Sequence, residues 1–184
     1  MLSPLATIFA HHLLLLLLIM AKVYWIHELT NGARLGTMAR PRGDQWLEDD
    51  ITSLQKQGVS VLVSLLERGE VYELGLALEA ESCAMVQIKF VNFPIPDREI
   101  PTSNAAVDAL VNELKDLLSK GHSIAIHCRM GIGRSSIIAA SVLLQKDDKV
   151  EDMIATISKA RGLSVPDTEE QLSWLKKRTK DRFY

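Results

Sequence analysis

The sequence predicts an α/β fold in which a central, mainly parallel sheet is flanked by helices. Short β-branched or apolar runs alternate with longer segments of helical spacing, and this alternation is typical of successive βα units. Two of the runs, 59–66 and 124–127, are apolar in the way that strands covered on both faces are. The 184 residues suffice for one compact core and are short for two, so we expect a single domain over 22–184.

The predicted elements follow one another from residue 23 onward. Residues 23–26 form a short first strand, and the glycine- and proline-containing stretch 32–44 predicts turns. Asp44 is the expected N-cap of the first helix. The other predicted strands are 59–66, 85–91 and 124–127, and the predicted helices are 44–57, 70–80, 135–145, 149–161, 167–181 and one that runs from Thr102 or Ser103 to Lys120.

The charge balance argues against a nucleic-acid partner. The chain has 21 basic and 23 acidic residues, a formal net charge of −2, whereas nucleic-acid binders usually carry a basic face. Only two cysteines occur, Cys83 and Cys128, so a disulfide framework is not expected and a reducing, cytoplasmic location is the simpler assumption. Cys83 reads as a core residue, with a resolving thiol for Cys128 as the alternative.

An apolar leader, residues 1–21, precedes the predicted domain. Its uninterrupted apolar run, 13–21, is too short to span a bilayer alone, and no basic residue comes before Lys22. Three interpretations stay open. The leader is dispensable because Met20 is the true start, or residues 2–21 anchor a cytoplasmic catalytic domain in a membrane, or the leader directs secretion.

The stretch from Cys128 to Ser135 predicts an anion-binding loop. It connects a buried strand to a helix N-terminus, where unpaired amides and the helix dipole attract an oxyanion. Gly131 and Gly133 let backbone amides approach the anion closely, and the planar guanidinium of Arg134 can hold two phosphate oxygens. The sequence therefore predicts a phosphate site.

The same loop predicts nucleophilic chemistry at Cys128. A helix N-terminus and a guanidinium favour the thiolate, which can attack phosphorus, and the Ser135 hydroxyl can stabilise the sulfur when it leaves. His127 is expected to face backbone groups behind the loop and to fix its shape. The loop lacks an acid for the leaving oxygen, and Asp97, in the proline-rich loop after the preceding strand, is the candidate. We expect it to act as the acid in the first step and as the base toward water in the second. Glu99 and Asp108 compete less well.

The pattern His127-Cys128-(x)5-Arg134-Ser135, with Gly131 and Gly133 inside, resembles the active-site loop of the cysteine-dependent tyrosine and dual-specificity protein phosphatases. "FPIPDREIP" and "RGLSVPDTEEQ" resemble the compact dual-specificity group related to the cyclin-dependent-kinase-associated phosphatase. The resemblance implies phosphatase-type α/β architecture and hydrolysis of phosphomonoesters through a phosphocysteine, without metal or cofactor. It also implies that Gln171 helps to position the hydrolytic water. The implied substrate-binding residues are Arg129, Met130, Gly131, Ile132, Gly133 and Arg134.

The departures from related enzymes bear on the substrate. Met130 and Ile132 stand where lipid-directed relatives carry lysines, so the resemblance favours a phosphorylated protein, with phosphotyrosine accepted and phosphoserine or phosphothreonine as a further option. We expect a monomer that binds no nucleic acid and meets a membrane only through the leader. Two alternatives to a protein phosphatase are a phosphate-recognising module without turnover and a thiol-based arsenate reductase or sulfurtransferase.

Overall fold

A computed structural model describes residues 20–145 and 147–183, so residues 1–19 of the apolar leader lie outside the described residues. Five strands form one sheet in the order β1-β2-β5-β3-β4. The strands are β1 (Tyr24–Glu28), β2 (Arg34–Ala39), β3 (Val61–Ser64), β4 (Lys89–Asn92) and β5 (Ile124–Cys128). Only β1 is antiparallel to its neighbour, which confirms the expected mainly parallel sheet.

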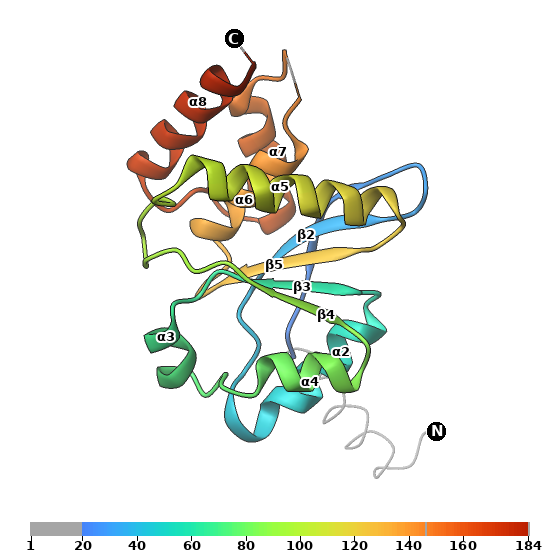
Figure 1. The fold of residues 1–184 in the computed structure, drawn as a ribbon. Helices are drawn as coiled ribbons and strands as arrows, with labels where there is room; N and C mark the ends of the chain where they lie inside the picture. The colour runs from blue at the N-terminus through green and yellow to red at the C-terminus, as the bar shows by residue number, and fades with distance from the viewer. Residues whose placement is uncertain (1–19, 146, 184) are drawn as a thin grey trace, which may run out of the picture.

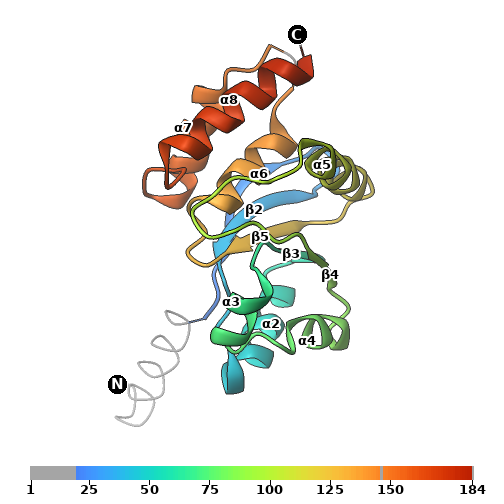
Figure 2. The same ribbon diagram turned by 60° about the vertical axis from the view of Figure 1, so that its left-hand side comes forward.

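Helices cover both faces of the sheet (Figure 1). Their bounds are η1 (Asp44–Trp46), α2 (Leu47–Lys56), α3 (Arg68–Glu73), α4 (Glu79–Met85), α5 (Asn104–Ser119), α6 (Arg134–Leu143), α7 (Val150–Arg161) and α8 (Glu169–Phe183). α5 and α6 lie on one face and α2 and α4 on the other, while α7 and α8 pack beyond α6 (Figure 2). The result is the three-layer α/β arrangement that the alternating pattern predicts.

Side chains of β5 alternate between the two cores. Ile124, Ile126 and Cys128 join the core beneath α5 and α6, whereas Ala125 joins the core beneath α2 and α4. This alternation follows from the two-residue period of a strand. Every residue of β5 is buried, which explains why the strand reads as an apolar run in the sequence.

Three expectations about local structure were wrong. The stretch expected to form turns contains β2, which lies in the middle of the sheet beside β5. The helix expected over 70–80 is two helices, because Gly75 has a φ of 67° that a continuing helix does not allow. Asp44 does not cap a helix with its side chain, since its own φ is 52° and it is the first residue of η1. Ser103, in contrast, caps α5 by accepting from the Ala106 amide at 3.2 Å.

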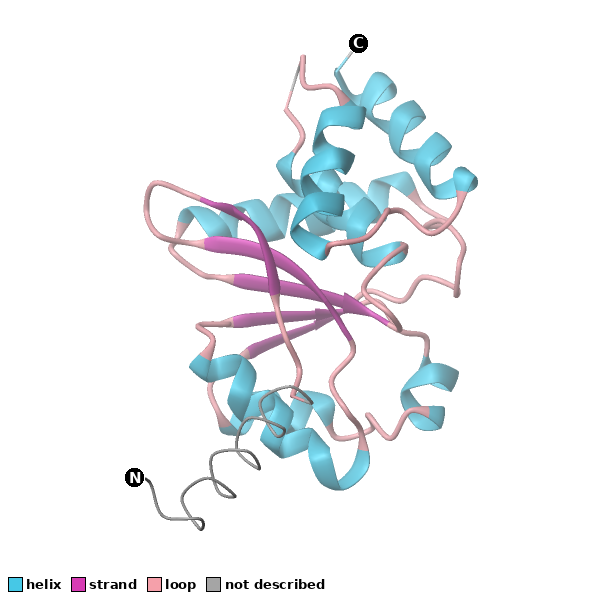
Figure 3. Cartoon of the chain, turned by 180° about the vertical axis from the view of Figure 1, so that it is seen from behind, coloured by secondary structure: helices cyan, strands magenta, loops and turns pink. Residues whose placement is uncertain are grey.

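The carboxyl ends of the parallel strands meet at one edge of the sheet (Figure 3). Ala39 of β2 is in register with Cys128 of β5, and Ser64 of β3 is in register with both His127 and Asn92. The loops that follow these strands therefore converge, and this edge is where open α/β sheets bind ligands. Within the described part of the chain, no helix is long and apolar enough to cross a membrane.

Candidate active site

The loop between β5 and α6 depends on two glycines. Gly131 has a φ of 68°, and a β-carbon there would lie 2.3 Å from the Met38 carbonyl of β2, so only glycine fits. Gly133 precedes α6 as its N-cap, so the loop ends at the N-terminus of a helix, where the first amides lack intrahelical acceptors. This is the kind of position that the predicted oxyanion site requires.

Arg134, the first residue of α6, is only 2% exposed and is held by four groups. Its Nη1 and Nη2 donate to the two Glu70 carboxylate oxygens at 2.7 and 2.9 Å. Nη1 also donates to the Ile95 carbonyl at 2.9 Å and to the Leu65 carbonyl at 3.5 Å. Nη2 also donates to Asp97 Oδ1 at 2.7 Å. Arg134 lines the cavity together with Asp97, which accepts from Nη2.

Glu70 is a site residue that the sequence reasoning missed. It lies in α3, where it also accepts from the Glu67 amide at 3.1 Å as part of a capping box. Burial opposes ionisation of Glu70, but the hydrogen bonds from Arg134 and from the Glu67 backbone outweigh it and lower the pKa of the carboxyl. Because the carboxylate stays charged, it fixes the Arg134 guanidinium in one orientation.

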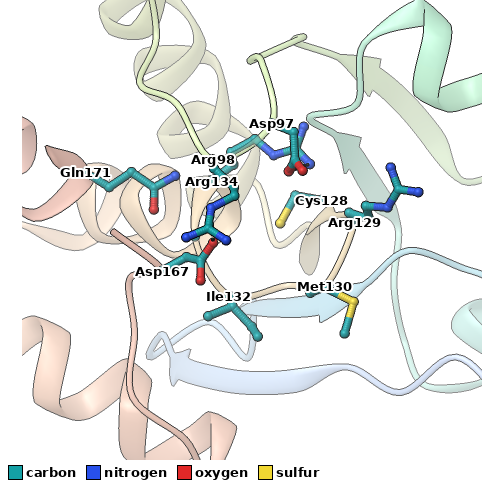
Figure 4. Close-up of a pocket in the computed structure, with 10 residues that line it drawn as sticks. Asp97, Arg98, Cys128, Arg129, Met130, Ile132, Arg134, Asp167 and Gln171 are labelled. Carbon is teal, nitrogen blue, oxygen red and sulfur yellow. Dashed lines mark hydrogen bonds and ion pairs between the residues drawn. The ribbon is translucent and has the colours of Figure 1, made fainter. Parts of the chain in front are cut away.

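Cys128 is the last residue of β5 and lies at the floor of the cavity (Figure 4). Its Sγ donates to Ser135 Oγ at 3.5 Å, and both side chains are buried. When the sulfur is a thiolate the roles reverse, and the Ser135 hydroxyl donates to it. The structure therefore brings the expected nucleophile and the expected hydroxyl into contact.

His127 faces a carboxylate and not the backbone groups that the sequence reasoning expected. Its Nε2 lies 3.0 Å from Glu79 Oε1 of α4, and both side chains are buried. The contact has the distance of an ion pair without the angles of a hydrogen bond. Glu79 meets the imidazole because α4 packs on the sheet face behind the loop.

Asp97 reaches the cavity from the loop that follows β4, as its sequence position predicts. Its carboxylate is half-exposed and is hydrogen-bonded to Arg134. The competing Asp108 lies on α5 and pairs with Arg178 at 2.6 Å, away from the residues that line the cavity. Glu99 is exposed and also does not line it.

The cavity has a volume of about 240 Å³ and is lined by Asp97, Arg98, Cys128, Arg129, Met130, Ile132, Gly133, Arg134, Asp167 and Gln171. Charges alternate around its mouth, since Arg129 pairs with Glu73 and Arg98 pairs with Asp167. Met130 is 61% exposed at the rim and offers an apolar contact beside these charges. In the described residues, no group of three or more His, Cys, Asp or Glu side chains is placed to hold a metal ion.

Arg161 of α7 holds the loop through a backbone carbonyl and is a second residue that the sequence did not predict. Its Nη2 donates to the Met130 carbonyl at 3.0 Å, and its guanidinium lies 4.0 Å from the Tyr24 ring. Burial lowers the pKa of Arg161, although the neighbouring Tyr24 and Cys128 act in the opposite direction. A charged residue near the end of a helix gives no sequence signal that distinguishes this position from a solvated one.

Gln171 is buried in α8, where it joins two walls of the cavity. Its Nε2 donates to the Glu99 carbonyl of the Asp97 loop at 3.0 Å. A β-carbon on Gly133 would lie 2.6 Å from Gln171 Oε1, so the side chain also packs against the anion-binding loop. Among the described residues, Oε1 has no hydrogen-bond partner.

A parallel sheet with an anion-binding Cys-Arg loop between a central strand and a helix defines the fold of the tyrosine and dual-specificity phosphatases. Residues 36–148 match the family model described as "Polymorphic toxin system, DSP-PTPase phosphatase". The chain therefore belongs to this phosphatase family. Tyrosine and dual-specificity phosphatases are phosphoric monoester hydrolases.

Individual relatives agree with this assignment. Cyclin-dependent kinase inhibitor 3 of Rattus norvegicus is 25% identical over 131 residues, which make up 70% of this chain and 61% of that protein. A putative tyrosine phosphatase of Invertebrate iridescent virus 6 is 31% identical over 90 residues, 47% of this chain and 33% of that protein. The chain therefore matches about three fifths or less of the length of these relatives.

Solved structures confirm the fold. A kinase-associated phosphatase whose catalytic-site cysteine is replaced by serine superposes with a TM-score of 0.79 and 21% identity, covering 88% of this chain and 96% of that chain. PTPMT1, solved in complex with PI(5)P, gives a TM-score of 0.67 at 19% identity, covering 86% of this chain and 96% of that chain.

Proposed function

We propose that residues 22–184 form a protein phosphatase domain that hydrolyses phosphotyrosine, and also phosphoserine or phosphothreonine, through a phosphocysteine intermediate. The observation that carries the proposal is the meeting of three groups in one cavity, namely the Cys128 thiol, the fixed Arg134 guanidinium and the Asp97 carboxyl, with the buried Ser135 hydroxyl in contact with the sulfur. Each has the chemistry that one step of the reaction requires.

In the first step the Cys128 thiolate attacks phosphorus. The S–P bond forms and the P–O bond to the substrate breaks, while Asp97 donates a proton to the departing oxygen. The loop amides and Arg134 hold the phosphoryl oxygens as charge develops on them. Asp97 accepts a hydrogen bond from Arg134 Nη2, so a phosphoryl group that binds this guanidinium displaces the Asp97 carboxylate. The displaced carboxylate takes up a proton from solvent and donates it to the departing oxygen.

In the second step water attacks the phosphocysteine. The water oxygen bonds to phosphorus, and the water proton passes to a carboxylate that lines the cavity. The S–P bond breaks, the electron pair returns to sulfur, and the Ser135 hydroxyl stabilises the thiolate that is restored. Inorganic phosphate leaves and the enzyme returns to its starting state. No cofactor takes part in this scheme.

The cavity favours a phosphoprotein over a polyphosphoinositide. Its mouth places Met130 and Ile132 beside the nucleophile, and the two further arginines there, Arg98 and Arg129, are each paired with a carboxylate. An additional phosphate would have to compete with Asp167 or Glu73 for these arginines, whereas the aromatic ring of phosphotyrosine can pack against the exposed Met130 side chain.

Hydrolysis of p-nitrophenyl phosphate tests the proposal. We expect activity in the wild type and in Cys83→Ala, and none in Cys128→Ser. Retained activity in Cys128→Ser would contradict the phosphocysteine mechanism. Binding of a phosphopeptide without turnover would identify a recognition module, sulfur transfer from thiosulfate would identify a sulfurtransferase, and preferential hydrolysis of a phosphoinositide over a phosphotyrosine peptide would correct the substrate class.

A further inference from the structure

A second carboxylate, that of Asp167, lines the cavity beside the anion-binding loop. We propose that Asp167 is the base that removes a proton from the water attacking the phosphocysteine, while Asp97 serves as the acid of the first step. The inference rests on the proposed phosphatase function and divides between two residues the work that one aspartate would otherwise do twice. Figure 4 shows Asp97 and Asp167 on different sides of the cavity.

The position of Asp167 brings it close to a bound phosphoryl group. A β-carbon placed on Gly133 would lie 3.0 Å from Asp167 Cβ, so Asp167 packs directly against the loop whose amides face the anion. Asp167 immediately precedes Thr168, whose Oγ1 accepts from the Gln171 amide at 3.2 Å at the start of α8. The carboxylate therefore stands on a segment fixed by the helix start, as a base that acts repeatedly at one place requires.

The partners of the two aspartates differ in a way that suits the two roles. Asp97 is bound to the buried Arg134 at 2.7 Å and must leave it before it can act. Asp167 is paired with Arg98 at 3.5 Å, and the two side chains are 40% and 68% exposed. Such an exposed pair is weak, so the Asp167 carboxylate can exchange Arg98 for water at little cost. Arg98 still offsets its negative charge near the phosphoryl group.

Gln171 complements this role but cannot fill it. Its amide oxygen lies against Gly133 and can orient a water by accepting a hydrogen bond, but an amide does not accept the proton. Asp167 is the carboxylate on the same wall of the cavity. In the proposed step, water oxygen bonds to phosphorus, its proton passes to an Asp167 oxygen, the S–P bond breaks and sulfur takes the electron pair. Asp167 then returns the proton to solvent.

Rapid-mixing kinetics with p-nitrophenyl phosphate test the proposal. This leaving group needs little acid assistance, so the first step stays fast and the second limits turnover. We expect Asp167→Asn to lower kcat by about 100-fold, the range of lost general-base catalysis, with kcat/KM changed less than about threefold. The variant should release a burst of p-nitrophenol close to one per active site, and acid quenching should trap the phosphocysteine.

Two matched variants complete the experiment. Asp167→Glu restores a carboxylate and should recover much of the lost kcat, whereas Glu169→Gln removes a charge two residues away, outside the cavity lining, and should behave as the wild type. Equal losses in kcat and kcat/KM, unchanged kinetics, or a lower kcat without trapped phosphoenzyme would each overturn the role of Asp167. A wild type that never releases p-nitrophenol would instead refute the phosphatase function.

Discussion

Asp97 Oδ1 and Arg134 Nη2 are hydrogen-bonded at 2.7 Å, so the candidate acid occupies part of the candidate phosphate clamp. The other contacts of Arg134, with Glu70 and the Ile95 carbonyl, hold its remaining Nη hydrogens in place. Asp97 is thus the one half-exposed partner of a buried cation, and it is the partner that an incoming phosphoryl group can replace.

This competition predicts that removing the Asp97 carboxylate strengthens oxyanion binding while it slows catalysis. Asp97→Ala should bind inorganic phosphate about tenfold more tightly, because the anion no longer displaces a charge-assisted hydrogen bond. Its kcat for a phosphotyrosine peptide should fall by about 100-fold or more. Isothermal titration with phosphate measures the first effect, with Glu99→Gln as the control from the same loop. Weaker phosphate binding in Asp97→Ala would show that the two groups do not compete.

Glu70 should be a positioning residue for Arg134. Glu70→Gln keeps the shape but loses the charge that orients the guanidinium, and we expect kcat/KM to fall by about 10- to 100-fold. Glu73→Gln on the same helix, which affects Arg129 instead, should have a smaller effect. Restored activity in Glu70→Asp would support positioning, while equal losses in the Glu70 and Glu73 variants would argue against it.

The same carboxyl should contribute to the pH dependence of stability. The pKa of Glu70 is lowered in the folded protein from its ordinary value of 4.5, so the folded state is stabilised above this value and loses that contribution as the pH falls through the folded pKa. Urea unfolding from about pH 6 to about pH 3 should therefore show a smaller acid-induced loss of stability in Glu70→Gln than in the wild type. Parallel curves would contradict the lowered pKa.

The buried contact between His127 and Glu79 predicts a loss of stability when the pair is broken. Glu79→Ala leaves the imidazole buried without its neighbour and should reduce the free energy of unfolding by about 1–3 kcal/mol. Glu81→Ala, on the exposed side of α4, should change it by less than about 0.5 kcal/mol. Chemical denaturation compares the two, and equal values would show that the Glu79 contact adds no stability.

The two cysteines should differ in reactivity. Burial, assisted by the neighbouring Glu79 charge, raises the pKa of Cys83 to about 12, so its thiol stays protonated and inert at neutral pH. Iodoacetamide should label Cys128, which lines the cavity, and spare Cys83 in the native protein. Peptide mass spectrometry identifies the labelled thiol. Labelling of Cys83 under native conditions would contradict its assignment to the core.

The sequence predicts the order of strands and helices because the interior strands are apolar runs and the helices carry apolar residues at helical spacing. β2 is missed because its glycine resembles a turn signal. In the structure Gly36 is needed for close packing, since a β-carbon there would meet Val23 Cγ1 at 2.7 Å. A glycine in a crowded strand and a glycine in a turn look the same in a single sequence.

Some residues of the candidate site can likewise be predicted from the sequence, and others cannot. Cys128, Arg134 and Ser135 are contiguous enough for their spacing to reveal their chemistry, and Asp97 follows from its place after a strand. Glu70 and Glu79 could not be found, because each is one of several acidic residues in a helical segment and only tertiary packing decides which of them is buried. Asp167 was likewise hidden, since nothing in its local sequence places it against Gly133.

The most direct test of the central claim is a rapid acid quench of the wild-type protein during turnover of p-nitrophenyl phosphate, followed by peptide mapping. We expect one phosphoryl group per chain, attached to Cys128 Sγ, and none in Cys128→Ser. Turnover without a phosphorylated Cys128, or phosphorylation at another residue, would contradict it.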